Sequence, residues 1–402
     1  MNAIVLAGLS ARMMVEAAAR DGYLPLALDV FGDLDTRSQA AHWQSIGRAS
    51  ELRIDGARFI AALERLAQRG DVIGWVAGSG FEAQPDLLEA GARCLRLLGT
   101  PPEDVRRVRN PHCFFGWLDS QGTPHPEVCW QCPPPSSGWL AKRADSAGGW
   151  HIRRVDDLAA DATDQAQAHG EASSYYQREV AGTPMSALFV GNGTCAQVLG
   201  FNQLIVQPVG PHPFVYCGAV GPVYLAAAHA SALQRLLDAS VAEFGLKGLG
   251  SLDFMLERTR LSVLELNPRP SASMALYSSV PLMRSHVLAC RQSALPSPQA
   301  PGCASLPVQG SEIIYAPGPL RVSAEAAAWL ACQRDVHDLP ASGAAFVAGN
   351  PVCSISAHGG HALQVRERLS RRRDAVLEVL AGALEPSSTK RPGPSRATDA
   401  IA

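Results

Sequence analysis

The chain has 402 residues, of which 47% are hydrophobic, enough to build two or three domains around a substantial core. Its 35 basic residues nearly balance its 37 acidic ones, so the composition favours neither a nucleic-acid-binding surface nor a polyanionic partner. No uninterrupted apolar run is long enough to span a bilayer, and the apolar start, MNAIVLAGLSAR, lacks a basic region and a convincing cleavage site. We therefore expect a cytoplasmic protein without a membrane or nucleic-acid partner.

The first hundred residues predict a parallel α/β unit. Residues 3–7 (AIVLA) have the composition of a short buried strand, a helical pattern follows, and residues 24–28 form the next strand. A later strand, within VIGWVAGSG at 72–80, ends in a glycine-rich turn. The order strand, turn, helix, strand favours a parallel sheet with helices on its faces.

Small and polar residues follow these strands, at the edge where their carboxyl ends meet. Ligands of such sheets bind beyond this edge, although ordinary turn chemistry accounts for the same residue types. The turn GLSAR does not match GxGxxG, so the sequence does not predict a dinucleotide site. The residues expected to line this edge are Gly8, Ser10, Asp29 and the turn Gly78-Ser79-Gly80.

One cysteine pair, Cys129 and Cys132 in CWQC, has the spacing of a metal-ligand motif. A structural zinc site needs four ligands, and no second CxxC or HxxxH lies nearby. The ten cysteines of the chain are scattered over many core-like positions. We therefore expect reduced thiols, and at this pair two thiols in a proline-rich loop rather than a zinc site.

A hairpin between residues 138 and 155 combines a lysine with a flexible loop. Its first strand ends at Lys142, residues 144–149 form a small-residue loop, and residues 151–155 form the return strand. Backbone N–H groups at a glycine tip and one point charge suit a phosphate group, although a plain surface hairpin has the same pattern. It is not a Walker A loop, because no helix or GK[ST] follows. The chain has only three lysines, which makes a lysine at this position informative.

A second hairpin brings acidic side chains together. The strands LDFMLE and LSVLEL are joined by a short turn, and Asp253 and Glu265 are their internal acids. A carboxylate in the apolar run VLEL is costly unless a partner such as a metal ion offsets its charge. Glu265, Asn267 and Arg269 alternate along the strand end. This spacing suits a metal-phosphate site, and a solvated strand end has the same pattern.

The segment after residue 290 is less informative. Residues 296–307, rich in Pro, Ser and Ala, predict a linker or long loop. Strands are expected at 311–315 and 346–355, followed by a helix at 361–384 whose basic run, RRR, we expect to be a solvated face.

In their order along the chain, these motifs resemble the ATP-grasp superfamily. The shared features are the lysine strand with its glycine loop, a strand at 175–180 (YYQREV) with a turn at 181–184, and GLGSLDF followed by ELNPR, which is the most specific. The likeness covers residues 104–274. Within the superfamily the chain is most similar to a group of predicted ATP-dependent carboligases related to biotin carboxylase.

The resemblance implies a mixed fold of α/β plus α+β type. The expected parts are an N-terminal parallel-sheet, pre-ATP-grasp domain at 1–100, a two-subdomain ATP-grasp fold at 101–290, a linker with a small C-terminal β-rich and helical region at 291–385, and a disordered tail at 386–402.

The resemblance also implies that ATP would bind between the two subdomains. Lys142 would contact the α- and β-phosphates, and the loop at Gly148 and Gly149 would close over them. Arg269 would bind the substrate carboxylate or the acyl phosphate, a task that suits a guanidinium group.

The adenine and metal contacts follow from the same resemblance. Backbone groups of Arg178 and Val180 would recognise adenine, with the Gln177 side chain nearby. Carboxylate and amide oxygens are the ligands that a hard cation prefers. The expected ligands of one or two Mg²⁺ ions, or of Mn²⁺ in their place, are Asp253, Glu265 and Asn267.

Two positions depart from the superfamily pattern. Around Asn110 many members carry a second lysine that binds the nucleotide, and here only Arg107 or Arg109 is available in its place. Where many members have an acid for the ribose, this chain has Thr183-Pro184-Met185. Neither departure touches the expected metal ligands, so we expect an active enzyme in which these two contacts to ATP are weakened or replaced.

The implied reaction is ATP-dependent amide formation by a carboxylate–amine ligase, through an acyl phosphate, with ADP and phosphate as products. Its partners are then small-molecule carboxylate and amine substrates, and a glutamate-type amino-acid ligase in coenzyme biosynthesis is one candidate. Two alternatives stay open: a carboxylase that activates bicarbonate, although the chain has no biotin-carrier Met-Lys-Met motif, and a non-catalytic nucleotide-binding protein. A homodimer is one option for its assembly, since superfamily members are often dimers.

Overall fold

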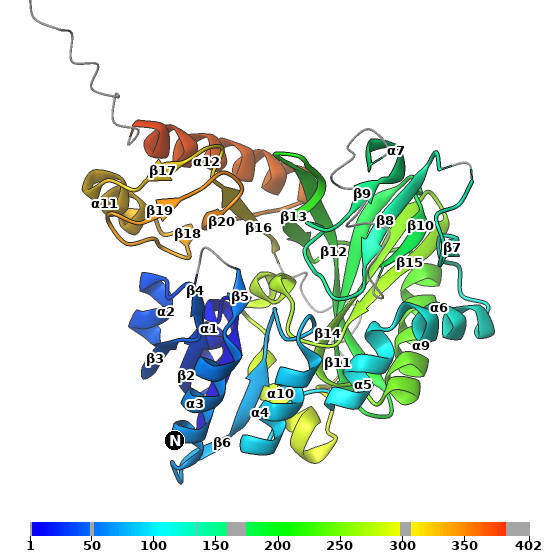
Figure 1. The fold of residues 1–402 in the computed structure, drawn as a ribbon, viewed down its shortest axis with the longest axis horizontal. Coiled ribbons are helices and arrows are strands. Elements are labelled where there is room, and N and C mark those ends of the chain that lie inside the picture. Colours follow the sequence, from blue (N-terminus) through cyan, green and yellow to red (C-terminus); the bar gives the residue numbers. More distant parts are fainter. Residues whose placement is uncertain (1, 49–51, 135, 159–173, 298–306, 383–402) are drawn as a thin grey trace, which may run out of the picture.

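The computed structural model of the protein describes residues 2–48, 52–134, 136–158, 174–297 and 307–382. Figure 1 shows an N-terminal α/β unit (blue) beneath the C-terminal elements (orange to red), with the strands of two further sheets beside them. The predicted tail at 386–402 and most of the predicted linker at 296–307 lie outside the described residues. None of the described helices is long and apolar enough to cross a membrane.

The N-terminal unit is built on a four-stranded parallel sheet in the order β3-β2-β1-β6. The parallel sheet predicted from the sequence is confirmed, and every residue of β1 is buried, as its apolar run requires. Edge strand β3 was not predicted, because HWQS has no apolar pattern. The elements are β1 (Ala3–Gly8), α1 (Arg12–Arg20), β2 (Leu24–Asp29), α2 (Leu34–Gln39), β3 (His42–Ser45), the β4–β5 pair (Gly47–Arg48, Arg53–Ile54), α3 (Gly56–Ala67), β6 (Val72–Ala77) and α4 (Pro85–Cys94).

A small antiparallel sheet in the order β7-β10-β8-β9 carries the lysine strand. The return strand predicted at 151–155 is shorter than expected, because only two residues pair with β8 and Val155 already begins a helix. The elements are α5 (Pro102–Arg109), α6 (Pro111–Ser120), β7 (Val128–Cys129), β8 (Trp139–Arg143), β9 (Arg153–Arg154), α7 (Val155–Leu158) and β10 (Ser174–Arg178).

An eight-stranded sheet in the order β15-β14-β11-β12-β13-β16-β20-β18 forms the largest layer. The hairpin predicted around the two acids is confirmed, and Asp253 lies directly opposite Glu265 in the register of β14 and β15. Strands from beyond residue 290 continue this sheet through the pairing of β13 with β16. Its strands are β11 (Thr183–Asn192), β12 (Ala196–Val209), β13 (His212–Gly221), β14 (Lys247–Glu257), β15 (Arg260–Asn267), β16 (Val308–Tyr315), β18 (Val336–His337) and β20 (Pro351–Gly359).

The turn predicted at 181–184 is wrong in its second half, because Thr183 and Pro184 belong to β11. Proline lacks the N–H that a central strand donates on one side. Pro184 is paired with Met255 on β14, while the pairing of β11 with β12 begins one residue later, at Met185. The proline therefore occupies a place where β11 still has only one neighbour.

Helices cover both faces of the large sheet. Along β11, Ala187 and Phe189 join the core beneath α9 (Ala227–Phe244), while Leu188 and Val190 join the core beneath α10 (Leu282–Gln292). This alternation is the two-residue period of a strand that is buried on both faces. The remaining elements are η1 (Ala272–Tyr277), β17 (Leu320–Arg321), α11 (Ala324–Cys332), β19 (Ala345–Phe346) and α12 (Ala362–Gly382).

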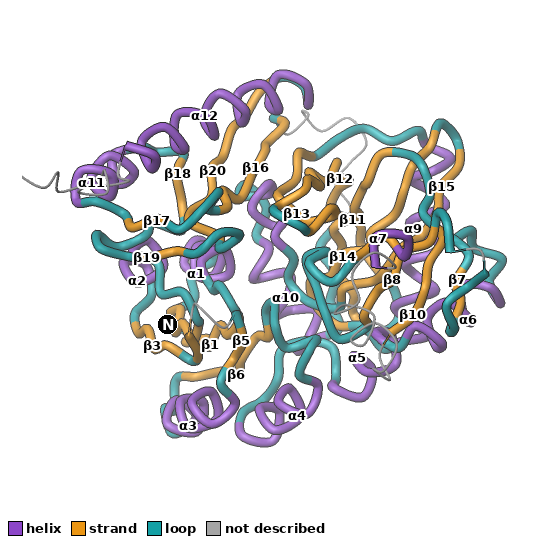
Figure 2. The backbone as a smooth tube through the Cα atoms, turned by 45° about the horizontal axis from the view of Figure 1, so that its top comes forward, coloured by secondary structure: helices purple, strands orange, loops and turns teal. Residues whose placement is uncertain are grey.

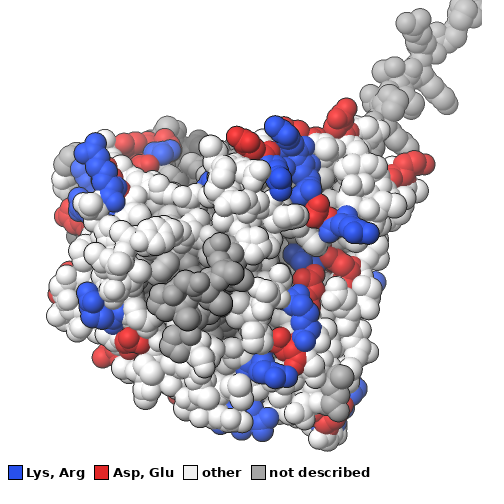
Figure 3. All heavy atoms as spheres, turned by 180° about the vertical axis from the view of Figure 1, so that it is seen from behind, with Lys and Arg blue, Asp and Glu red and all other residues white. Residues whose placement is uncertain are grey.

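The basic run of α12 is not the solvated face that the sequence predicted. The helix lies along β16 and β20 (Figure 2). Arg373 donates to Glu312 of β16 over 2.9 Å, and Arg372 is paired with Asp335. Two of the three arginines therefore hold the helix on the sheet. On the face seen in Figure 3, basic and acidic side chains of the described residues lie interspersed.

His286 joins the N-terminal unit to the large sheet. Its ring is 1% exposed, Nδ1 accepts the N–H of Leu249, and Nε2 donates to the carbonyl oxygen of Leu98, both over 2.9 Å. Burial lowers the pKa of His286 from 6.5 to about 4. Between pH 6.5 and pH 4 the histidine is protonated in the unfolded chain but neutral in the folded chain. The free energy of unfolding therefore decreases as the pH falls through this range.

We expect this histidine to account for about 2 kcal/mol of the free energy of unfolding that is lost between pH 7 and pH 5. Urea unfolding at both pH values should therefore show a smaller pH-dependent loss in His286→Gln than in the wild type. The exposed His42, exchanged for Gln in the same way, is the control and should leave the loss unchanged. Equal losses in the wild type and in His286→Gln would contradict the assignment.

Candidate active site

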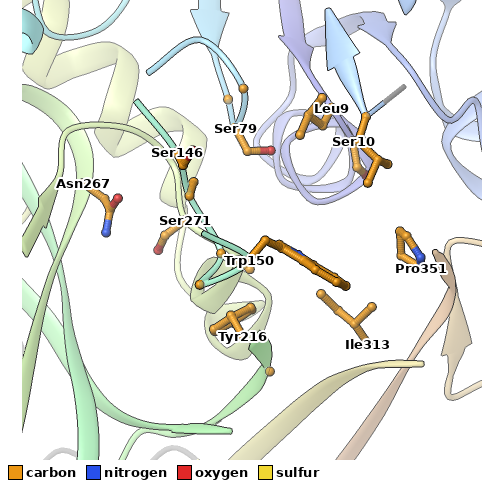
Figure 4. A pocket seen from close by; sticks show the side chains of 18 of the residues that line it. Leu9, Ser10, Ser79, Ser146, Trp150, Tyr216, Asn267, Ser271, Ile313 and Pro351 are labelled. Carbon is orange, nitrogen blue, oxygen red and sulfur yellow. The ribbon is translucent and has the colours of Figure 1, made fainter. Parts of the chain in front are cut away.

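A cavity of about 1320 Å³ lies where the N-terminal unit, the two antiparallel sheets and the C-terminal strands meet. Small-molecule sites usually measure about 300–1,000 Å³, so this cavity has room for more than one substrate. Figure 4 shows side chains from all of these parts turned towards one space, among them Ser79, Trp150, Asn267 and Ile313.

The three predicted metal ligands lie together in this cavity. Asn267 donates its side-chain N–H₂ to Asp253 Oδ2 over 3.2 Å and to Glu265 Oε1 over 3.4 Å. The antiparallel register of β14 and β15 places the two carboxylates opposite each other. Three oxygen-bearing side chains on one face of a hairpin form the donor set that Mg²⁺ prefers.

The two carboxylates have opposite electrostatic environments. Burial would raise the pKa of Glu265, but Arg109, Lys142 and His151 outweigh it and hold the pKa at about 2. Burial and the neighbouring Glu265 raise the pKa of Asp253 well above its ordinary value. The repulsion between adjacent carboxylates is the situation that a bound divalent cation relieves.

Lys142 projects from β8 beside this cluster. Its residue is 9% exposed, and Nζ donates to Gln177 Oε1 over 2.6 Å. Burial lowers the pKa of Lys142, whereas Glu265 and Asp253 act to raise it. The ammonium group is therefore held in the cavity wall by a neutral amide.

Arg109 is a site residue that the sequence proposed only as an alternative. Its Nη1 donates to Glu265 over 3.1 Å, and its Nη2 donates to the carbonyl oxygens of Ala144 and Ser146 over 3.0 and 2.9 Å. Arg109 therefore joins the glycine loop at 144–149 to the β14–β15 hairpin that carries Asp253 and Glu265, here called the acidic hairpin. Arg107, the other alternative, is half-exposed and is paired with Asp104 and Glu243.

The glycine loop is folded against β13. Gly148 accepts the N–H of Tyr216 over 2.9 Å, and both Gly148 and Gly149 have left-handed φ angles of +70° and +79°. A Cβ atom at Gly149 would lie 1.9 Å from the carbonyl oxygen of Phe214. Only glycine allows the loop backbone to approach the strand this closely.

Arg269 lies at the border between the acidic hairpin and the N-terminal unit. Its Nε donates over 2.6 Å to Glu82, which in turn accepts the N–H of Gly80 over 2.8 Å. Glu82 was not identified from the sequence, although it follows the glycine turn predicted at the ligand edge. This ion pair fixes the guanidinium group where the turn at 78–80 enters the cavity wall.

A family model described as an ATP-grasp domain matches residues 112–273. The chain contains an ATP-grasp domain. The match includes Lys142, the glycine loop and the acidic hairpin, so the ATP-grasp motifs predicted from the sequence and the cavity coincide. No curated protein matches the chain significantly.

Solved structures share the fold over nearly the whole chain. The biotin carboxylase domain of 2-oxoglutarate carboxylase from Hydrogenobacter thermophilus, in complex with MgADP, ADP and bicarbonate, is 11% identical, with a TM-score of 0.70 over 94% of this chain and 89% of that chain. The L-amino acid ligase from Bacillus licheniformis is 15% identical, with a TM-score of 0.66 over 93% and 97%. N5-carboxyaminoimidazole synthase from Aspergillus clavatus, in complex with ADP and 5-aminoimidazole ribonucleotide, is 16% identical, with a TM-score of 0.64 over 95% of this chain and 99% of that chain. At such identities the likeness shows the fold alone.

The strand end expected to contact adenine borders the same cavity. Gln177, Arg178 and Val180 all line it. The backbone N–H of Arg178 donates to the carbonyl oxygen of Glu127 over 2.8 Å, so it is not free to bind a base. The backbone N–H of Val180, by contrast, donates to no backbone carbonyl among the described residues. The Nε2 of Gln177 is buried without a hydrogen-bond partner among the described residues.

These observations fit a nucleotide in the ATP-grasp domain. A buried amide without a partner is costly, and a bound base or ribose would supply the missing acceptor. His151 Nδ1 is also buried without a partner among the described residues, and its residue lines the cavity. The oxygen-rich hairpin likewise fits Mg²⁺.

Two further expectations from the sequence have different outcomes. Ser10 and the turn at 78–80 line the cavity, but Gly8 and Asp29 do not. Asp29 is fully buried and accepts hydrogen bonds from Ala11, Gly32 and Trp43, which is a structural role. The nine cysteines that the structure describes are free thiols, and Cys132 is exposed.

Gly149→Ala should weaken nucleotide binding at least about tenfold, because the added Cβ combines left-handed strain of about 1–2 kcal/mol with a collision against β13. The measurement is the dissociation constant of a non-hydrolysable ATP analogue by calorimetry. Gly122→Ala is the matched control, since Gly122 has a φ of +60° with nothing within 4 Å of the added atom. An unchanged dissociation constant in Gly149→Ala would show that loop docking does not support the nucleotide.

Proposed function

We propose that the protein is a Mg²⁺-dependent carboxylate–amine ligase that forms an amide through an acyl phosphate. The observation that carries this proposal is the convergence of Asp253, Glu265 and Asn267 with Lys142 and Arg269 in one cavity. Oxygen ligands, an ammonium group and a guanidinium group are the components that phosphoryl transfer to a carboxylate requires.

The chemistry explains why the components must be adjacent. A carboxylate reacts poorly with an amine because its leaving group would be oxide, and phosphorylation provides a good leaving group. Mg²⁺ held by the acidic hairpin would neutralise charge on the transferred phosphoryl group. Alignment of the carboxylate with the γ-phosphate supplies much of the remaining rate enhancement.

Different residues of this chain would bind the phosphates, the carboxylate and the base. Lys142 would hold the α- and β-phosphates, and Arg269, fixed by Glu82, would hold the carboxylate or the acyl phosphate. The backbone at Gly148 and Gly149 would cover the phosphates and exclude water, which would otherwise hydrolyse the acyl phosphate. Val180 and Gln177 would recognise the base.

A ligase needs room for the nucleotide, an acid and an amine, and a carboxylase needs room for the nucleotide, bicarbonate and the acceptor of the carboxyl group. A cavity of about 1320 Å³ exceeds the usual size of a single ligand site and suits either set of reactants. The fold similarity to the L-amino acid ligase is compatible with the proposed ligase, and the similarity to the biotin carboxylase domain keeps the carboxylase as the alternative that the experiment must separate. The resemblance of the sequence to the superfamily, taken by itself, makes a glutamate-type acid one candidate substrate.

The test is Mg²⁺-dependent ADP release in the presence of hydroxylamine, across a panel of amino acids and small carboxylic acids. Hydroxylamine traps an acyl phosphate as a hydroxamate, so the acid that yields a hydroxamate is the substrate. ADP release that depends on bicarbonate, without a hydroxamate, would replace the proposal with a carboxylase. ATP-analogue binding with no ADP release from any acid would replace it with a non-catalytic nucleotide-binding protein.

A further inference from the structure

The cavity is also lined by residues of the N-terminal unit and the C-terminal strands that the proposed ATP and metal contacts do not use. The part of the cavity between this unit and these strands is here called the distal chamber. The residues that define it are Leu9, Met13, Met274, Ile313, Phe346 and Pro351. These six side chains come from segments that are far apart in the sequence, and together with further apolar residues of the same segments they outnumber the polar ones there, such as Ser10, Asp33 and Ser311.

Trp150 closes this chamber on the side of the nucleotide. It directly follows Gly149 in the glycine loop, and in Figure 4 its indole points towards Ile313 and Pro351, with Leu9 and Ser10 across the space. The ring stands edge-on to Tyr315 and His212, with centroids 5.4 and 5.0 Å away. The same loop thus presents backbone to the phosphates and an aromatic face to the chamber.

The charges around the chamber disfavour an anionic ligand. The buried Arg12 is saturated, because it donates to Asp338 over 2.7 and 3.1 Å and to Glu16 over 3.0 Å. Asp33 lines the cavity, and no hydrogen bond engages its carboxylate among the described residues. Burial, together with Asp338 and further acids, raises the pKa of Asp33 to about 8.

The basic side chains at the rim of the cavity do not make the chamber favourable for an anionic ligand. Arg37 and Arg53 line the cavity from exposed positions, and Arg37 is stacked over the ring of Trp43 at 3.8 Å. With a pKa of about 8, Asp33 is mainly protonated near pH 7, and the burial and the acids that raise its pKa would disfavour the charge of a second carboxylate, as in glutamate, in the same way. An uncharged hydrocarbon chain incurs no such desolvation cost.

We propose that the distal chamber binds the apolar chain of the carboxylic acid that is activated, and that Trp150 forms the wall which selects this chain. The proposal rests on the proposed function, because it takes Arg269 as the carboxylate contact. The acid is then one with a large aliphatic or aromatic chain, not an acid of the glutamate type. When the glycine loop lies against β13, Gly148 and Gly149 would cover the phosphates and Trp150 would close the distal chamber at the same time.

Calorimetry on the full chain, saturated with Mg²⁺ and a non-hydrolysable ATP analogue, tests the assignment without catalysis. The ligands are matched pairs of similar shape: leucine with asparagine, valine with threonine, and 4-methylpentanoate with succinamate. We expect the apolar member to bind at least about tenfold more tightly in at least one pair. Trp150→Ala should reduce that preference to less than about threefold, while Trp150→Phe retains most of it.

The matched control is Trp130→Ala, which removes a 42% exposed tryptophan that is stacked on His112 outside the cavity, and it should leave the preference intact. Two results with the wild-type protein would each overturn the inference: polar members that bind as tightly as their apolar partners, or no binding of any of the acids. If Trp150→Ala weakens the binding of the apolar and the polar acid of a pair equally, Trp150 has only a structural role and does not select the chain. Apolar acids that bind selectively but give no hydroxamate would contradict the proposed function and leave the chamber assignment standing.

Discussion

Glu265→Gln is expected to lower ADP formation by about 100- to 1,000-fold. The substitution preserves shape but removes one of the two carboxylate charges of the hairpin, and with it the strongest acid of the cluster, whose pKa is held at about 2. It also leaves Arg109 without the carboxylate that it contacts over 3.1 Å. Metal affinity and loop position should therefore both decline, and higher Mg²⁺ concentrations should restore only part of the activity.

Steady-state ADP release over a Mg²⁺ titration is the measurement, and Glu257→Gln is the control. Glu257 is an exposed residue at the other end of the same hairpin, paired with Arg260 in the register. It changes the formal charge of the protein equally and should keep activity within about twofold, as surface substitutions usually do. If Glu265→Gln keeps more than a fifth of wild-type activity, the acidic hairpin is not the metal site.

The local parts of this site were predictable because their cause lies in neighbouring residues. Alternation along β14 and β15 and the short turn between them predict the hairpin and its two internal acids, but a regular continuation of the pair Phe254–Val263 would place Asp253 opposite Leu264. The irregularity between Asp253 and Phe254, which brings Asp253 opposite Glu265, was not predictable from the pattern. The parallel sheet of the N-terminal unit, like the hairpin itself, followed from the pattern of its strands. Such arguments need no knowledge of tertiary packing.

The contacts across units were not predictable, because each joins residues that no local pattern relates. Glu82 meets Arg269 across 187 positions, and Arg12 meets Asp338 across 326. A buried carboxylate and a buried guanidinium each need a partner, but a sequence alone does not say which one. Arg109 illustrates the same limit: its residue type left it equivalent to Arg107 until the fold turned one towards Glu265 and the other towards solvent.

Lys142→Met is expected to weaken binding of the ATP analogue about 10- to 100-fold, equivalent to about 1.5–3 kcal/mol for the loss of a charged hydrogen-bond donor. Methionine has nearly the same length and apolar stem, so the change isolates the ammonium group. That group is buried, its one described hydrogen bond goes to the neutral amide of Gln177, and burial lowers its pKa. A polyphosphate would supply the negative charge that this environment lacks, and the variant loses that attraction.

Calorimetric dissociation constants for the analogue in the wild type and in both lysine variants provide the test. Lys247→Met is the control, because Lys247 is the other described lysine and does not line the cavity. If the two variants bind the analogue equally well, the phosphates do not lie at β8 and the orientation proposed for the nucleotide is wrong. If only Lys142→Met binds weakly, the result places the polyphosphate between Lys142 and the glycine loop, with its end directed towards the acidic hairpin and Arg269.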